Sequence, residues 1–284
     1  MKSSNLVSTE ILSDHLEDPT WIIIDCRFNL KFPDEGENDY LKKHIHGAQY
    51  VHLERDLSGP ILNGQLGRHP LPDLDACKQT FSSLGISSEK QVVAYDNSGG
   101  AIAARFWWML RWLGHNKSAL LDGGWDLWAK ENRPCSKGRE SGQHVNFNAK
   151  PQKFWIVNEE QIDQSLKKKE ILLLDVRNGS RFRGENEPID TIAGHIPGAK
   201  NEPFQVNLDQ NGLWKKSDKL RAQYLKRFPE LEQNKCVSYC GSGVTACHTF
   251  FALHEAGFEN LSIYPGSWSG WISDPSRPIA LGND

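Results

Sequence analysis

The sequence lacks the features that define several large classes of protein. Six cysteines in 284 residues are too few for a disulfide scaffold, and no apolar stretch approaches the length of a membrane span. The net charge of −3 gives no basic surplus that would indicate nucleic acid. Residues 1–10 contain no apolar core of signal-peptide length. We therefore expect a cytoplasmic protein with reduced thiols and with no membrane and no nucleic-acid partner.

What the sequence does contain is an internal repeat. The chain of 284 residues has room for about two domains. Segments of its two halves match in the same order, which indicates a tandem duplication. The matching pairs are 22–27 with 172–177, 44–48 with 195–199, 92–96 with 236–240, and 123–125 with 266–268.

Each half alternates short apolar runs with amphipathic, helical patterns. Such uninterrupted apolar runs are typical of parallel strands that are buried on both faces. The pattern predicts the α/β class, with two domains that each hold a mainly parallel sheet flanked by helices. We expect these domains at 1–131 and 153–284, joined by a linker at 132–152. The predicted strands are 22–24, 92–95, 119–121, 172–174, 236–239 and 261–264.

The segment Cys240–Thr245 is the most informative part of the chain. It follows the apolar run 236–239 and begins a helical pattern. A loop between a strand and a helix points several backbone N–H groups at its first side chain, and the helix dipole adds positive potential. Both effects favour a thiolate, so we expect a lowered pKa and a nucleophilic sulfur at Cys240. Gly241 and Gly243 supply the close backbone approach that such a cradle needs.

Other interpretations of Cys240 can be weighed on the sequence. A buried, inert thiol is the common fate of an isolated cysteine. A cysteine phosphatase needs an arginine six residues after the cysteine, and that residue is Ala246. A zinc or thioredoxin-like site needs a second cysteine at short spacing, whereas the neighbours are Cys236 and Cys247. The strand–loop–helix context favours a reactive thiol over these alternatives.

The two halves differ at this nucleophile. Asp96 stands in the first half where Cys240 stands in the second. A carboxylate cannot act as a thiol nucleophile, so the first domain keeps the fold without the chemistry. The repeated histidines, His44 and His195, are interpreted as structural residues that fix a turn.

These features resemble the two-domain rhodanese family of sulfurtransferases. The resemblance rests on the duplicated α/β unit, on the Asp-x-Arg and His-Ile-x-Gly-Ala signatures, and on a catalytic loop in the second half alone. It covers roughly residues 6 to 280. The Cys-Gly-Ser-Gly-Val-Thr loop looks like that of members that use 3-mercaptopyruvate, since members that prefer thiosulfate usually carry two basic residues there.

The resemblance implies a sulfur-transfer reaction. The Cys240 thiolate attacks the sulfur of the donor, becomes a persulfide, and passes the sulfane sulfur to cyanide, thioredoxin or another thiol. The loop residues Gly241, Gly243, Val244 and Thr245 would contact the donor. No bound cofactor and no metal is implied.

By the same resemblance, side chains outside this loop contact the donor or move a proton. Arg181, in the Arg-Phe-Arg-Gly motif, pairs with the donor carboxylate. Ser242, His69 and Glu54 form a relay that delivers a proton to the leaving enolate. Phe28 supplies an aromatic wall.

Each of these residues also has a simpler interpretation. Arg181 could hold the Asp175–Arg177 loop in an ion pair. Ser242 could be a small loop residue or a helix N-cap, and His69 could be a surface residue. Asp56 competes with Glu54 as the acid of the relay.

The chain departs from the family pattern after the Arg-Phe-Arg-Gly motif. Members that use mercaptopyruvate carry a second substrate arginine there, whereas residues 185–190 contain none. Arg68 could join Arg181 in this role. The missing arginine favours thiosulfate as the donor, and the neutral loop opposes it. A further alternative is a sulfur-carrier or protein-binding module in which a partner protein loads Cys240.

Overall fold

The chain folds into two compact units. The computed structural model describes residues 5–61, 67–168 and 170–283. No helix of these residues is long and apolar enough to cross a membrane. The first unit comprises Met1–Gly59, Pro72–Gln152 and Gln210–Trp214, and the second comprises Pro60–Leu71, Lys153–Asp209 and Lys215–Asp284.

The units are not contiguous in the sequence, unlike the predicted domains. Residues 60–71 lie in the first half of the chain and are grouped with the second unit, while 210–214 are grouped with the first. The expected linker at 132–152 belongs to the first unit and contains a two-residue strand, Cys135–Ser136. The two α/β domains are as predicted. The grouping of 60–71 with the second unit and of 210–214 with the first has no signal in local sequence patterns.

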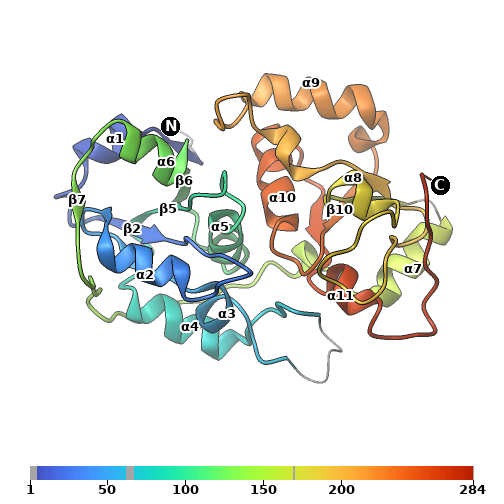
Figure 1. Cartoon of the computed structure of the whole chain (residues 1–284), viewed down its shortest axis with the longest axis horizontal. Helices are drawn as coiled ribbons and strands as arrows, with labels where there is room; N and C mark the ends of the chain where they lie inside the picture. Colours follow the sequence, from blue (N-terminus) through green and yellow to red (C-terminus); the bar gives the residue numbers. More distant parts are fainter. Residues whose placement is uncertain (1–4, 62–66, 169, 284) are drawn as a thin grey trace. The chain divides into compact units, whose positions relative to one another are not determined.

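The main sheet of the first unit is parallel throughout, with the strand order β1-β6-β5-β2-β4 (Figure 1). Its central strands contain the predicted apolar runs, each extended by one or more residues. A separate antiparallel pair is formed by β3 and β7. The bounds are β1 (Leu6–Val7), β2 (Trp21–Asp25), β3 (His44–Ile45), β4 (Gln49–Tyr50), β5 (Gln91–Tyr95), β6 (Ser118–Leu121) and β7 (Cys135–Ser136).

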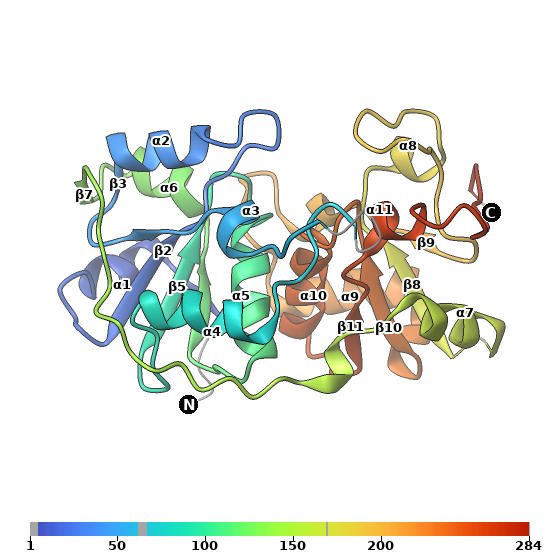
Figure 2. The same cartoon turned by 90° about the horizontal axis from the view of Figure 1, so that it is seen from below.

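Helices cover both faces of this sheet. Ile23 and Val93 share a core with Leu12 of α1 and Trp128 of α6. Helix α5 packs on β5 and β6, and Figure 2 shows α4 and α5 on the side opposite α1 and α6. The bounds are α1 (Thr9–Asp14), α2 (Glu35–Lys42), α3 (Leu53–Asp56), α4 (Leu74–Ser83), α5 (Ala103–Trp112) and α6 (Gly124–Lys130).

The second unit repeats this architecture with the parallel order β11-β10-β8-β9. Leu173 and Val237 share a core with Ile162 of α7 and Trp271 of α11, while α10 packs on β10 and β11. The bounds are β8 (Ile171–Asp175), β9 (Lys200–Asn201), β10 (Lys235–Tyr239), β11 (Leu261–Ile263), α7 (Glu159–Lys168), α8 (Gly179–Phe182), α9 (Ser217–Arg227), α10 (Ala246–Glu255) and α11 (Ser267–Trp271).

The duplication extends to short antiparallel backbone pairings and to the repeated histidines. In the first unit His44 lies in the antiparallel β3–β7 pair, and in the second His195 forms an antiparallel bridge to Ala280. The Nδ1 of each histidine lies 2.8 Å from a backbone carbonyl, that of Tyr40 or of Phe182. These buried rings fix turns, in agreement with the structural role expected from the sequence.

A buried ion pair anchors the Asp-x-Arg motif of each unit. Arg177 donates to Asp175 at 2.5 Å and to the Gly194 carbonyl at 2.7 Å, with both charged side chains almost fully excluded from solvent. Arg27 and Asp25 form the equivalent pair at 2.6 Å. Because a charge in the interior is costly unless it is paired, each motif depends on both partners.

We expect Arg177→Met to lower the free energy of unfolding by about 3–5 kcal/mol, because Asp175 would remain buried without its counter-ion. Urea unfolding measures this change. The control is Arg183→Met, which removes an exposed pair with Glu185 and should change stability little. Equal losses in the two variants would contradict a structural role for the buried pair.

Candidate active site

Cys240 directly follows β10, at the carboxyl end of the sheet, and its side chain is buried, with 2% exposure. Burial alone would raise the pKa of its thiol. Hydrogen bonds from the Thr245 hydroxyl and from the backbone N–H groups of Ser242, Ala246 and Gly243 outweigh burial, so the pKa is lowered. This direction agrees with the thiolate cradle expected from the sequence.

The N–H groups can face the sulfur because the loop carbonyls are bound elsewhere. The carbonyl of Cys240 accepts from the Trp268 N–H at 2.9 Å, and that of Gly241 accepts from the Ser269 N–H at 2.9 Å. The first residues of α11 thus satisfy the loop acceptors. Gly243 has a φ of +79°, and a Cβ there would lie 2.4 Å from the Pro265 carbonyl oxygen, so only glycine fits.

The other cysteines contrast with Cys240. All six lie in the described part of the chain and none forms a disulfide. Burial raises the pKa of Cys26, which nearby Asp96 raises further, and burial also raises the pKa of Cys236. A lowered pKa in a buried position therefore marks Cys240 as a candidate nucleophile.

His69 lies next to the Cys240 loop because residues 60–71 belong to the second unit. Its Nδ1 is 2.7 Å from the Ser242 hydroxyl oxygen, and the imidazole is buried. The backbone N–H of Arg68 donates to the Ser269 hydroxyl at 3.1 Å. Gly67 has a φ of +83° and a Cβ there would lie 2.6 Å from the Gly266 carbonyl oxygen. The close approach of this segment to the turn before α11 therefore positions His69.

Two arginines also lie over the loop. A Cβ added to Gly241 would lie 3.0 Å from Arg68 Nη2 and 3.4 Å from Arg181 Nη2. Arg181 donates from Nε to Glu187 at 3.0 Å and from Nη2 to Asp190 at 2.9 Å. Asp190 also forms an ion pair with Arg68.

Arg181 therefore does not hold Asp175, which is paired with Arg177 instead. The sequence patterns do not indicate Glu187 and Asp190, because the distinctive feature of this segment is its lack of arginine. The available signal was the alternation of acids around Pro188 just after an Arg-rich motif.

Glu54 and Phe28 belong to the first unit. Glu54 lies in α3 with an exposed side chain. Asp56 accepts the His52 backbone N–H at 2.7 Å, and burial raises the pKa of its carboxyl. The buried Phe28 ring meets His52 edge-on at 5.0 Å. Their roles in the relay and as an aromatic wall stay predictions.

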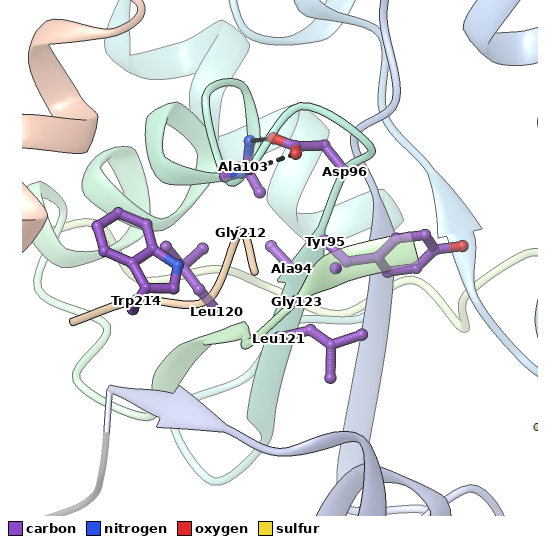
Figure 3. A pocket seen from close by; sticks show the side chains of 12 residues that line it. Ala94, Tyr95, Asp96, Ala103, Leu120, Leu121, Gly123, Gly212 and Trp214 are labelled. Atoms are coloured by element: carbon purple, nitrogen blue, oxygen red, sulfur yellow. Dashed lines mark hydrogen bonds between the residues drawn. The ribbon is translucent and has the colours of Figure 1, made fainter. Parts of the chain in front are cut away.

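The equivalent loop of the first unit holds a carboxylate. Asp96 accepts four backbone N–H groups at 2.8–2.9 Å, from Ser98, Gly100, Ile102 and Ala103. Figure 3 shows its carboxylate hydrogen-bonded to Ala103, and both residues line a cavity of about 10 Å³, the size of one water molecule. The cradle of this unit is filled by its own side chain and leaves no room for a substrate.

A family model described as "Rhodanese-like domain" matches residues 8–131 and 158–274. The chain belongs to this family. The two matched segments correspond to the duplicated α/β units, and Cys240 lies in the loop after the central strand of the second unit.

Individual relatives cover almost the whole chain. It is 41% identical over 284 residues, all of both chains, to a probable 3-mercaptopyruvate sulfurtransferase of Pseudomonas aeruginosa. It is 36% identical to a putative thiosulfate sulfurtransferase, SseB, of Mycobacterium tuberculosis, covering 92% of this chain and 90% of the relative. The crystal structure of SseA from Escherichia coli, a 3-mercaptopyruvate sulfotransferase, matches with a TM-score of 0.81 and 29% identity, covering 93% of this chain and 99% of that one.

The cradle predicts how Cys240 reacts as the pH changes. Alkylation by iodoacetamide should have its midpoint below that of an ordinary cysteine. Thr245→Val should raise this midpoint by about one pH unit, because a hydrogen bond to a charged group contributes roughly 1.5 kcal/mol. Cys240→Ser gives the background labelling of the other thiols. An unchanged midpoint in Thr245→Val would contradict the hydroxyl's part in holding the thiolate.

Proposed function

We propose that this protein is a sulfurtransferase that moves sulfane sulfur from 3-mercaptopyruvate to a thiol or cyanide through a persulfide on Cys240. The observation that carries the proposal is the lowered pKa of a buried cysteine in a cradle of N–H groups. Membership of the rhodanese-like family and the names of the relatives point to the same chemistry.

In the first half-reaction, the Cys240 thiolate attacks the sulfur of the donor. The S–S bond forms as the C–S bond of mercaptopyruvate breaks, and the electron pair of that bond leaves as the enolate of pyruvate. Arg181 and Arg68 would bind the donor carboxylate, and their approach to Gly241 supports this proposal.

The enolate must gain a proton to become pyruvate. We propose that Ser242 gives this proton and recovers it through His69, whose ring lies 2.7 Å from the hydroxyl. Glu54 stays our proposal for the acid that orients the histidine. Thiosulfate needs no such proton, because sulfite leaves as a stable anion.

In the second half-reaction, an acceptor attacks the outer sulfur of the persulfide and restores the Cys240 thiolate. Cyanide would leave as thiocyanate. A dithiol such as that of thioredoxin would release sulfide and become a disulfide. A free thiolate is best kept in a reducing compartment, so we propose the cytoplasm as the location.

Thiosulfate is the second candidate donor, because two arginines lie over the loop. The relative from Mycobacterium tuberculosis is named for this donor. Glu187 and Asp190 oppose it, because they balance the two positive charges. We therefore place mercaptopyruvate first.

The proposal is tested by sulfur transfer from each donor to cyanide and to a dithiol. We expect turnover that is faster with mercaptopyruvate and is abolished in Cys240→Ser. A preference for thiosulfate would change the donor and leave the mechanism standing. Turnover that survives without Cys240 would refute the mechanism, and a stable persulfide without turnover on either donor would favour the carrier module.

The proton relay makes a separate prediction. Ser242→Ala and His69→Gln should each lower kcat with mercaptopyruvate by about 10²–10⁴-fold, the usual contribution of a positioned acid. Turnover of thiosulfate serves as the internal control and should change by only a few-fold. If both donors slow equally, the pair holds the loop in place and does not transfer a proton.

A further inference from the structure

The two arginines over the Cys240 loop are held by two carboxylates of one short segment. Glu187 is the more fixed of the two. It accepts from Arg181 Nε at 3.0 Å, from Arg177 Nη1 at 3.3 Å, and from the backbone N–H groups of Ile189 and Asp190 at 3.1 Å each. These four donors come from two arginines and from the backbone of its own turn, so Glu187 holds Arg181 and is itself held by that turn.

Asp190 stands between the arginines. One carboxylate oxygen accepts from Arg181 Nη2 at 2.9 Å, and the other forms an ion pair with Arg68. Its side chain is only 3% exposed, against 14% for Arg181 and 30% for Arg68. A carboxylate that bridges two guanidinium groups beside the nucleophile is itself similar in charge and shape to the carboxylate of a donor.

The charges of this cluster cancel. Arg68 and Arg181 carry two positive charges, and Glu187 and Asp190 carry two negative ones. The guanidinium nitrogens that face Gly241 can still donate hydrogen bonds to an anion, but they do so from a site without net charge. A second negative charge on a bound donor is therefore repelled by Asp190 and by a Cys240 thiolate, and no excess positive charge compensates for this repulsion.

We infer that Asp190 is a specificity-determining residue that sets the charge of the sulfur donor. By neutralising the arginine pair, it favours a donor with a single negative charge, such as an α-keto carboxylate, over the dianion thiosulfate. The inference rests on the proposed function and names the feature that separates its two candidate donors. We call the four side chains of Arg68, Arg181, Glu187 and Asp190 the clamp. The inference gives the neutrality of this clamp a role, which the sequence of the Cys240 loop alone does not explain.

The test compares Asp190→Asn with wild type on both donors. Asparagine keeps the size of the side chain and an acceptor oxygen for Arg181, and it removes one negative charge. The ratio of kcat/KM for thiosulfate to that for mercaptopyruvate should rise about tenfold or more, since the dianion gains most from a net positive clamp. Asp190→Glu, which keeps the charge, should keep the wild-type ratio.

The matched control is Glu185→Gln, five residues before Asp190 in the same segment. Glu185 pairs with Arg183 on the surface, so this variant makes the same change in net charge away from the clamp. It should leave the donor ratio unchanged. A ratio that moves equally in Glu185→Gln and Asp190→Asn, or that does not move in Asp190→Asn, overturns the inference.

A binding measurement separates this inference from the proposed function. In Cys240→Ser, calorimetry should show that Asp190→Asn tightens thiosulfate by about tenfold and pyruvate by less. This result needs no turnover, so it can stand even if the wild-type protein proves inactive on both donors. Equal effects on the two anions, or weaker binding of both, would show that Asp190 only positions the arginines.

Discussion

Both units depend on one constraint, which is that the N–H groups after the central strand must face a negative group. In the second unit this group is the Cys240 sulfur, whose pKa the cradle lowers, and in the first it is the Asp96 carboxylate. A buried donor without a partner costs about 1–3 kcal/mol, so an empty cradle would be unstable. The backbone carbonyls of Cys240 and Asp96 are also bound alike. They accept from the N–H groups of Trp268 and Trp125, respectively, each at 2.9 Å. The cradle is thus a property of the fold, and the side chain at its centre decides whether the unit can do chemistry.

The strand beside the cradle holds it in place. In β8, Asp175 is paired in register with Tyr239, the residue before Cys240, and Asp25 is paired with the residue before Asp96 in the same way. Each aspartate is locked by its buried arginine. A shift of one residue in either strand would therefore move the Asp25 carboxylate away from the Tyr95 hydroxyl, which donates to it at 2.6 Å, and would separate Asp175 from Tyr239 in the same way. This makes the register, and with it the position of the loop, energetically well defined.

The part of this arrangement that is local could be predicted from the sequence. Fully buried parallel strands produce apolar runs, and a cysteine between such a run and a helix is predicted to lie in a cradle of N–H groups. The pairing of His69 with Ser242 was expected only by resemblance to a family, because no local pattern announces that residues 60–71 pack with the second unit. Asp190 escaped prediction for a similar reason. One of its two arginine partners, Arg68, comes from a distant segment, and only the folded loops bring the three charges together.

In the proposed mechanism, the same cradle serves both halves of the transfer reaction. Hydrogen bonds that lower the pKa of Cys240 raise the thiolate fraction, and they also make each thiolate somewhat less nucleophilic. In the persulfide, the negative charge lies on the outer sulfur, and the inner sulfur in the cradle is neutral. Attack by an acceptor returns the charge to the inner sulfur, where the N–H groups and the Thr245 hydroxyl stabilise it. The modest loss of nucleophilicity in the first step is therefore balanced by a better leaving group in the second, because a thiolate of low pKa is expelled faster.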